Sequence, residues 1–217
     1  MAKPNPDPIQ QQLIAARRNQ ILDAATQVFA DKGFARATIR DVATTAGIAD
    51  GTIYNYFENK TALLLGLLNR LNESDLRQGH FAQSAELDIA DFVQGYVQHR
   101  LEQFGPDELQ LLQVVLSEVL INRELRDLYY QQVLAPTFAL AEQYFEQWSM
   151  EGKIVSANPR MAPRMFAGMV LGVLILRLMG DRYLEIHWGD VPQALAAQAL
   201  SGLMPPEGDY DATDDQA

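Results

Sequence analysis

The sequence predicts an all-α protein with a small N-terminal unit of three short helices, followed by a larger helical body. Apolar residues recur along most of the chain at the three- and four-residue spacing of amphipathic helices. No stretch alternates apolar and polar residues with the period of a β-strand. Glycine and proline mark the expected ends of the helical segments.

Composition limits the class of protein. The chain has 217 residues, of which 48% are apolar and 21% charged, as in ordinary globular proteins. It contains no cysteine, which excludes disulfides and thiolate chemistry. The longest apolar run, from Met165 to Leu176, is shorter than the roughly 18 residues of a membrane span. We therefore expect a soluble cytoplasmic protein without a membrane partner.

Charge is distributed unevenly. The net charge is −11, but residues 1–70 carry eight lysines and arginines against six acids. The rest of the chain carries nine basic and 22 acidic residues. Because acidic surfaces repel phosphate, any contact with DNA is expected within the first 70 residues.

Four segments are predicted along the chain. Residues 1–14, rich in proline and glutamine, are expected to form a disordered arm. Residues 15–70 form the small helical unit and residues 71–204 the body. Residues 205–217 contain five acids and are expected to be a disordered tail.

The first two helices of the small unit have clear ends. The first begins near Arg17 and ends at Gly33, with an apolar stripe of Ile21, Ala24, Ala25, Val28 and Phe29. The second begins at Thr38, which can form a capping box with Asp41, and ends at Gly47.

A third, very short helix is predicted over residues 50–57, before a long fourth helix that begins at Asn59. Short helices joined by a glycine-containing turn have the layout of a helix-turn-helix. So short a helix buries too little surface to be kept for stability alone. Its outward side chains therefore indicate a DNA-reading surface, although they can also be the ordinary surface of a small bundle.

Three motifs with fixed spacing lie between Arg17 and Leu68. They are ILDAA-x-x-x-F-x-x-x-G-F at 21–34, T-x-x-D-V-A-x-x-A-G at 38–47 and G-T-I-Y-x-Y-F-x-x-K at 51–60. Together they resemble the DNA-binding region of the tetracycline-repressor (TetR) family of bacterial regulators, over about a quarter of the chain. The resemblance implies an N-terminal helix-turn-helix DNA-binding domain and a C-terminal helical ligand-binding and dimerisation domain.

The resemblance also implies which residues meet DNA. The second helix would lie across the backbone, and the third would enter the major groove. Gly51 lets the backbone approach a base edge, tyrosine and asparagine can hydrogen-bond in the groove, and Lys60 begins a helix, where anions are favoured. The predicted contacts are Thr38, Arg40, Gly51, Thr52, Tyr54, Asn55, Tyr56 and Lys60.

The sequence departs from the family at Ala49 and Asp50, where many members have serine and then a basic residue. Since alanine cannot cap a helix, Asp50 is expected to cap the third helix itself. Because an acid there would repel phosphate, Asp50 is left out of the predicted contacts. Other arginines can hold phosphates or form ordinary solvated surface: Arg17, Arg18 and Arg36.

In the body, helices are predicted over 88–104, 107–122, 123–134, 136–150, 159–180 and 190–204. The segment 159–180 is apolar nearly all round, so it must be buried on several sides. As in the family, it is expected to form a two-fold dimer interface together with the last helix. The alternative is the central core helix of a monomer. The predicted interface comprises Met165, Gly168, Met169, Gly172, Val173, Leu176, Leu195, Gln198 and Ala199.

An effector pocket is expected among the other body helices. Aromatic and methionine side chains at helical spacing favour an apolar or aromatic ligand, although such residues are usually core. The candidates are Tyr96, His99, Phe104, Leu116, Leu120, Phe138, Tyr144, Trp148 and Met165. The three histidines lie far apart in the sequence, so no metal site is expected, and no cofactor or catalytic residue.

The leading interpretation is a homodimeric, sequence-specific repressor, released from a palindromic DNA operator by a small apolar or aromatic effector. Dimerisation would double the few bases that one short helix can read. One alternative is a helical ligand-binding protein that does not regulate through DNA. Another is a regulator that answers to a protein partner instead of a small molecule.

Overall fold

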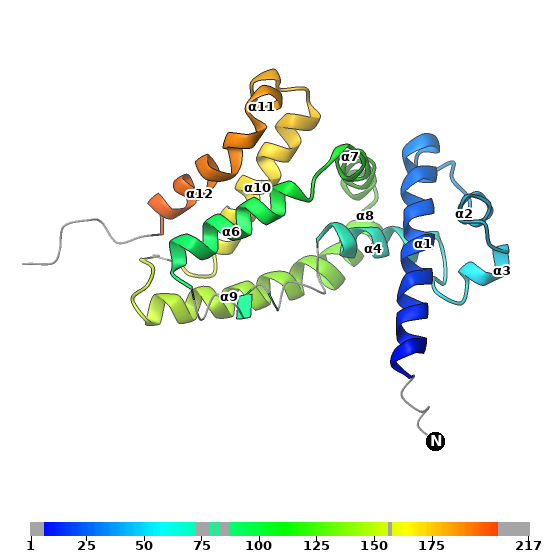
Figure 1. The fold of residues 1–217 in the computed structure, drawn as a ribbon, viewed down its shortest axis with the longest axis horizontal. Coiled ribbons are helices and arrows are strands. Elements are labelled where there is room, and N and C mark those ends of the chain that lie inside the picture. Colours follow the sequence, from blue (N-terminus) through cyan, green and yellow to red (C-terminus); the bar gives the residue numbers. More distant parts are fainter. Residues whose placement is uncertain (1–6, 73–78, 80, 83–86, 156–157, 204–217) are drawn as a thin grey trace, which may run out of the picture. The chain divides into compact units, whose positions relative to one another are not determined.

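The computed structural model describes residues 7–72, 79, 81–82, 87–155 and 158–203 (Figure 1). Every regular element in these ranges is helical, which confirms the predicted all-α class. The chain forms two compact units. The first contains residues 1–75 and 105–134, and the second contains residues 76–104 and 135–217.

The first unit holds the short N-terminal helices and two later ones. Its elements are α1 (Pro8–Lys32), α2 (Ile39–Ala46), α3 (Asp50–Ile53), α4 (Lys60–Leu71), α7 (Pro106–Ile121), α8 (Arg123–Tyr129) and a π-helical turn (Tyr130–Leu134). Leu111 and Val115 of α7 are buried in the same core as Ile21, Phe29 and Leu64. Packing therefore divides the chain differently from the predicted boundary at residue 70.

Helix α1 is longer than the sequence pattern indicated. It begins at Pro8, where the Asp7 side chain accepts a hydrogen bond from the backbone N–H of Ile9. Proline suits a first helical position because its missing N–H would be unpaired there anyway. The expectation of a disordered arm is therefore wrong for residues 8–14, and residues 1–6 lie outside the described residues.

The ends of α2 follow the prediction. Thr38 is the N-cap, and the capping box with Asp41 is present. Gly47 has a φ of +66°, in the left-handed region that glycine enters at little cost. This residue turns the chain from α2 toward α3.

Helix α3 is shorter than the predicted 50–57, since it ends at Ile53. The backbone N–H groups of Asn55 and Tyr56 bond to carbonyls three residues back, which tightens the end of the helix into a turn. Phe57, beyond the end of the helix, is nevertheless buried. The fourth helix begins as expected, with Asn59 as its N-cap.

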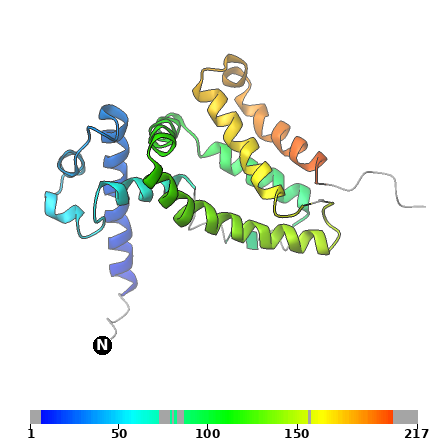
Figure 2. The same cartoon turned by 180° about the vertical axis from the view of Figure 1, so that it is seen from behind.

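The second unit contains α6 (Ile89–Glu102), α9 (Ala135–Met150), α10 (Ala162–Leu178), α11 (Arg182–Ile186), a 3-10 turn (Trp188–Asp190) and α12 (Val191–Ser201) (Figure 2). Helix α12 packs along α6, and α10 packs against both α9 and α12. Two ion pairs involve α9: Glu142 pairs with Arg164 of α10 at 2.7 Å, and Glu146 pairs with Arg160, in the turn before α10, at 2.8 Å. The short α11 was not predicted.

No loop separates the predicted helices 123–134 and 136–150. A π-helical turn over Tyr130–Leu134 leads directly into α9. Pro136 has no backbone N–H, and its ring crowds the carbonyl four residues earlier, so a wider turn at this point relieves the clash. The predicted acidic tail, residues 205–217, lies outside the described residues.

Candidate nucleic-acid interface

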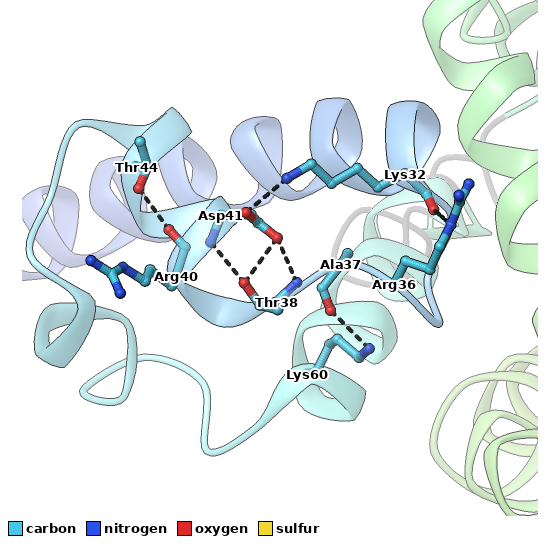
Figure 3. A network of polar contacts seen from close by, with 8 residues as sticks. All are labelled: Lys32, Arg36, Ala37, Thr38, Arg40, Asp41, Thr44 and Lys60. Carbon is cyan, nitrogen blue, oxygen red and sulfur yellow. Dashed lines mark hydrogen bonds and ion pairs between the residues drawn. The ribbon is translucent and has the colours of Figure 1, made fainter.

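A polar network fixes the start of α2 (Figure 3). The Thr38 hydroxyl donates to Asp41 Oδ2 at 2.8 Å, and the Asp41 backbone N–H donates to Thr38 Oγ1 at 3.1 Å. Lys32 Nζ of α1 lies 2.8 Å from Asp41 Oδ1. Hydrogen bonds from Lys32 and then from Thr38 lower the pKa of Asp41 from 3.8 to about 2. The hydroxyl predicted to hold phosphate is thus already part of a helix cap.

Lys60 is held by the loop between α1 and α2. Its ammonium donates to the carbonyl oxygens of Phe34 at 2.7 Å, Ala35 at 3.2 Å and Ala37 at 2.9 Å; Figure 3 shows the last of these bonds. It also lies 4.5 Å from the centre of the Phe34 ring. An ammonium group has three protons to donate, and the three carbonyls use them. Lys60 thus joins the start of α4 to the loop before α2, and its predicted contact with DNA stays a prediction.

Helix α3 presents a defined outer surface. Ile53 is fully buried and Phe57 is 3% exposed, which fixes the inner side of the segment. Tyr54 is 57% exposed, and Asn55 is also exposed. Gly51 is exposed, and a Cβ added to it would meet no atom within 4 Å. Thr52 and Tyr56 are half-buried.

Side chains of α1 contact the segments that carry this surface. Arg18 donates to the Tyr56 carbonyl at 3.4 Å, and its guanidinium lies 4.4 Å from the centre of the Phe57 ring. Gln20 donates to the Ala46 carbonyl at the end of α2, at 2.7 Å. The role of Gln20 was not predicted, because nothing in its sequence context distinguishes it from other exposed polar residues of α1.

Arg40 and Asp50 form an ion pair on the outer surface. Arg40 Nε lies 3.9 Å from Asp50 Oδ2, and their side chains are 85% and 55% exposed. Arg40 extends away from the capping network of Thr38 (Figure 3). The expectation that Asp50 caps α3 is wrong: Ala49 occupies the N-cap position, and no side chain caps the helix there.

The predicted effector residues are divided between the two units. Leu116 and Leu120 belong to the first unit and the others to the second. Leu120 is 70% exposed and Met165 is 64% exposed, so neither lines an enclosed pocket within its own unit. Phe104 is buried, whereas His99 is half-buried.

An aromatic cluster occupies the interior of the second unit. Phe81 stacks on Tyr144 with ring centres 5.0 Å apart, and Phe92 meets Trp148 edge-on at 5.4 Å. Tyr96 and Phe166 lie 5.8 Å apart, while Phe138 packs under the guanidinium of Arg164 at 4.8 Å. Three predicted residues thus come together: Tyr96, Tyr144 and Trp148. Sequence reasoning missed Phe81, Phe92 and Phe166, although Phe92 and Tyr96 have the i, i+4 spacing of helical neighbours.

The predicted interface residues separate into two sets. On α10, Leu174 is buried within the unit, whereas an apolar stripe is exposed: Met165, Gly168 and Leu176, together with Leu171, which was not predicted. Met169, Gly172 and Val173 are half-buried, and Gln198 of α12 is exposed. Leu195 and Ala199, however, are 6% and 7% exposed. These two residues face the core of their own chain, so they are not available to contact a second chain and are removed from the predicted interface.

Two kinds of feature are absent from the described residues. None of their helices is long and apolar enough to cross a membrane. Within the same ranges, no three histidine, aspartate or glutamate side chains gather as metal ligands.

Both parts of the chain match known protein families. Residues 21–67 match the bacterial regulatory proteins of the tetR family. Residues 91–182 match the C-terminal domain of AefR-like transcriptional repressors. The first match contains α2, α3 and all three of the motifs that predicted DNA binding.

Individual relatives agree. The fatty acid metabolism regulator protein of Bacillus subtilis is 39% identical over 72 residues, which cover 33% of this chain and 34% of that protein. This relative and the regulator TtgR of Pseudomonas putida are thus matched over only about a third of their length. The solved structure of the fatty acid degradation regulator FadR from Bacillus halodurans is similar with a TM-score of 0.72 and 25% identity, over 91% of this chain and 97% of that one.

A second solved structure is FadR from B. subtilis in complex with stearoyl-CoA. It is similar with a TM-score of 0.70 and 22% identity, over 85% of this chain and 98% of that one. At this identity the likeness concerns the fold alone. With both family matches in sequence order and the fold in agreement, the chain belongs to the TetR family of bacterial transcriptional regulators.

Proposed function

We propose that the protein is a homodimeric repressor that binds a palindromic DNA operator and is released from it by a small apolar or aromatic effector. The observation that carries the proposal is the surface of α3. Tyr54 and Asn55 are exposed on a segment whose other side is anchored by buried Ile53 and Phe57. Because these buried residues hold the short helix in position, its exposed side chains are suited to enter the major groove.

DNA contacts divide into two kinds. Tyr54, Asn55 and the exposed backbone at Gly51 are suited to base edges or the phosphates beside them. Arg40 is suited to phosphate, because its guanidinium is exposed and extends from α2. Lys60 and Thr38 act indirectly, since their polar groups hold the loop and helix that carry these contacts.

The homodimer would form through α10. Its exposed stripe of methionine, leucine and glycine is a large apolar surface for a single chain to leave in water. Gly168 is exposed and a Cβ added there meets nothing within 4 Å, so a second backbone could approach closely. The two helix-turn-helix units of the dimer (residues 15–70 of each chain, its heads), related by a two-fold axis, would read two half-sites about one DNA turn apart.

The effector would bind in the second unit, near the aromatic cluster. Tyr96 and Tyr144 are half-buried within it, which provides hydroxyl groups beside apolar ring surface. Such a mixture suits an apolar or aromatic ligand with a polar group. Effector binding would favour a body conformation in which the two heads no longer match successive major grooves, a coupling of about 1–3 kcal/mol in typical cases. Because the DNA of a bacterium lies in its cytoplasm, the repressor would act there.

The proposal is tested by fluorescence anisotropy with the purified chain and duplexes that tile its own upstream DNA, at two salt concentrations. We expect saturable, salt-sensitive binding to one near-palindromic duplex, because phosphate contacts release counterions. Long-chain acyl-CoA and aromatic compounds are then added to the complex. Weak binding spread evenly over all duplexes would contradict sequence-specific regulation, and ligand binding without release would contradict effector control.

A further inference from the structure

We propose that Asp50 is a specificity-determining residue that selects a cytosine in the major groove of each operator half-site. The inference rests on the proposed function, because it requires that α3 meets DNA. The predicted DNA contacts leave this position out, since a carboxylate is repelled by phosphate. Three properties of Asp50 answer that objection: its position beside Tyr54, the hydrogen-bond acceptor capacity of its carboxylate, and its ion pair with Arg40.

The first property is place. Asp50 begins α3, and Tyr54 follows four residues later, so their side chains lie on the same side of one helical turn. The Asp50 side chain is 55% exposed, and Tyr54 is 57% exposed. Ile53 fixes the opposite side of the turn in the core. Any DNA that Tyr54 contacts therefore lies within reach of the carboxylate.

The second property is acceptor capacity. Acidic residues at helix starts usually accept hydrogen bonds from the first backbone N–H groups. Asp50 does not, because Ala49 is the N-cap and no side chain caps α3. In the described part of the chain no hydrogen bond reaches its oxygens, since Arg40 Nε at 3.9 Å lies beyond hydrogen-bond distance. Both carboxylate oxygens remain available to a donor from outside.

The third property is the charged neighbour. Arg40 compensates the negative charge of Asp50, so the pair can approach phosphates with little net repulsion. An ion pair as exposed as this one contributes little to folding. Stability therefore does not account for placing both charges on this surface, whereas recognition of DNA does.

The chemistry of the group then selects the base. An ionised carboxylate only accepts hydrogen bonds. In the major groove cytosine presents its N4 amino group, a donor, whereas guanine and thymine present acceptors there. Adenine presents a donor beside an acceptor, N7, which repels a carboxylate. Cytosine is thus the matching base, and one such contact corresponds to a preference of roughly fivefold or more.

The test is selection of bound duplexes from a pool with a randomised segment, using the full chain. Wild type, Asp50→Ala and Asp50→Asn are compared, and Asp31→Asn serves as the charge-matched control, because Asp31 is exposed on α1. We expect wild type to enrich a cytosine at one position of each half-site. Asp50→Ala should lose that preference alone, Asp50→Asn should shift it toward adenine, and Asp31→Asn should change nothing.

The outcomes separate this inference from the proposed function. If wild type enriches a half-site and Asp50→Ala keeps every base preference, Asp50 does not read a base and the inference is overturned alone. If wild type enriches no sequence, the proposed function fails and this inference fails with it. Thermal unfolding by circular dichroism shows that each variant is folded before selection.

The role of Arg40 gives an independent check on the selected duplex. Arg40→Ala removes the proposed phosphate contact of Arg40 and also leaves the Asp50 carboxylate uncompensated, so binding should weaken by about tenfold or more. Arg40→Ala combined with Asp50→Ala should then bind more tightly than Arg40→Ala alone, because the repelling charge is gone. Equal affinities of the single and double variants would overturn the compensating role of Arg40.

Discussion

The Lys60 ammonium lies 2.7 Å from the carbonyl oxygen of Phe34 and 4.5 Å from the centre of the same residue's ring. One residue of the loop before α2 thus binds the lysine in two ways. Since Lys60 is the first residue of α4, this contact connects α4 to the helix-turn-helix. The family motif includes the lysine, and the structure gives it a role in positioning.

Replacing Lys60 should therefore affect folding more than phosphate binding. Lys60→Met removes hydrogen bonds from a charged donor, and we expect a loss of about 1.5–3 kcal/mol in the free energy of unfolding. The slope of DNA affinity against salt should stay close to that of wild type. Urea unfolding and anisotropy at several salt concentrations measure the two quantities.

Lys153→Met is the matched control, because Lys153 forms only an exposed pair with Glu151 and should change stability by less than about 1 kcal/mol. A Lys60 variant with wild-type stability and a salt slope smaller by about one unit would restore the phosphate role.

A side chain at Gly66 should destabilise the protein. It lies inside α4, where an added Cβ would come within 2.8 Å of Phe57 Cε1 and 3.1 Å of Leu22 Cδ2. Both neighbours are buried, so the ring cannot move away freely. We expect Gly66→Ala to cost about 1–3 kcal/mol by overpacking, reduced by a helix-propensity gain of about 0.5–1 kcal/mol.

Gly95→Ala is the control for this prediction, because a Cβ on that helical glycine meets nothing within 4 Å. It should stabilise the protein by about 0.5–1 kcal/mol. Denaturant unfolding of both variants provides the comparison. If Gly66→Ala were as stable as Gly95→Ala, the close packing of Phe57 against α4 would be disproved.

The helix-turn-helix unit could be predicted well from the sequence, because the signals that define its helix ends are local. Thr38, Asp41, Gly47 and Asn59 act on backbone groups within a few residues, so their capping roles can be read from spacing. The contact of Lys60 with Phe34 spans 26 residues and depends on how α4 packs, which spacing does not reveal.

Other predictions failed for tertiary reasons. Leu195 and Ala199 carry an apolar stripe that can face either a second chain or α6, and the sequence alone does not distinguish these partners. Phe81 and Phe166 are distant in sequence from Tyr144 and Tyr96, so only the folded chain brings them together. The start of α1 at Pro8 depends on the Asp7 cap. The residues after it are polar and rich in glutamine, so they lack the apolar periodicity by which a helix is predicted.

Asp41 should contribute to stability in a defined pH range. Its pKa is about 2 in the folded protein, below the ordinary value of 3.8, because Lys32 and Thr38 donate hydrogen bonds to the ionised form. The folded state therefore binds a proton less readily than the unfolded state. The resulting stabilisation is complete above pH 3.8 and is lost as the pH falls through about 2.

Urea unfolding of wild type and Asp41→Asn at several pH values checks this. We expect wild type to be the more stable near neutral pH and the difference to shrink between about pH 4 and 2. Asp31→Asn controls for the loss of a charge on the first unit. A difference that is constant over this range would show that ionised Asp41 adds nothing to stability.

The exposed stripe of α10 should hold two chains together. Leu176 is 47% exposed, and Leu176→Glu would bury an unpaired charge in the proposed interface. We expect sedimentation velocity to show a dimer for wild type and a monomer for the variant, with operator affinity weaker by at least about tenfold.

Gln113→Glu, an equal change of charge on an exposed position of α7, should remain dimeric. A dimeric Leu176→Glu variant with wild-type operator affinity would rule out α10 as the interface.

The most direct test of the central claim compares wild type with Tyr54→Ala on the enriched duplex and on a scrambled duplex of equal length. Fluorescence anisotropy at fixed salt gives both affinities. Because the exposed Tyr54 ring is assigned to the major groove, the variant should lose about 1–3 kcal/mol on the enriched duplex and almost nothing on the scrambled one. Full affinity and unchanged discrimination by Tyr54→Ala would show that α3 does not read DNA.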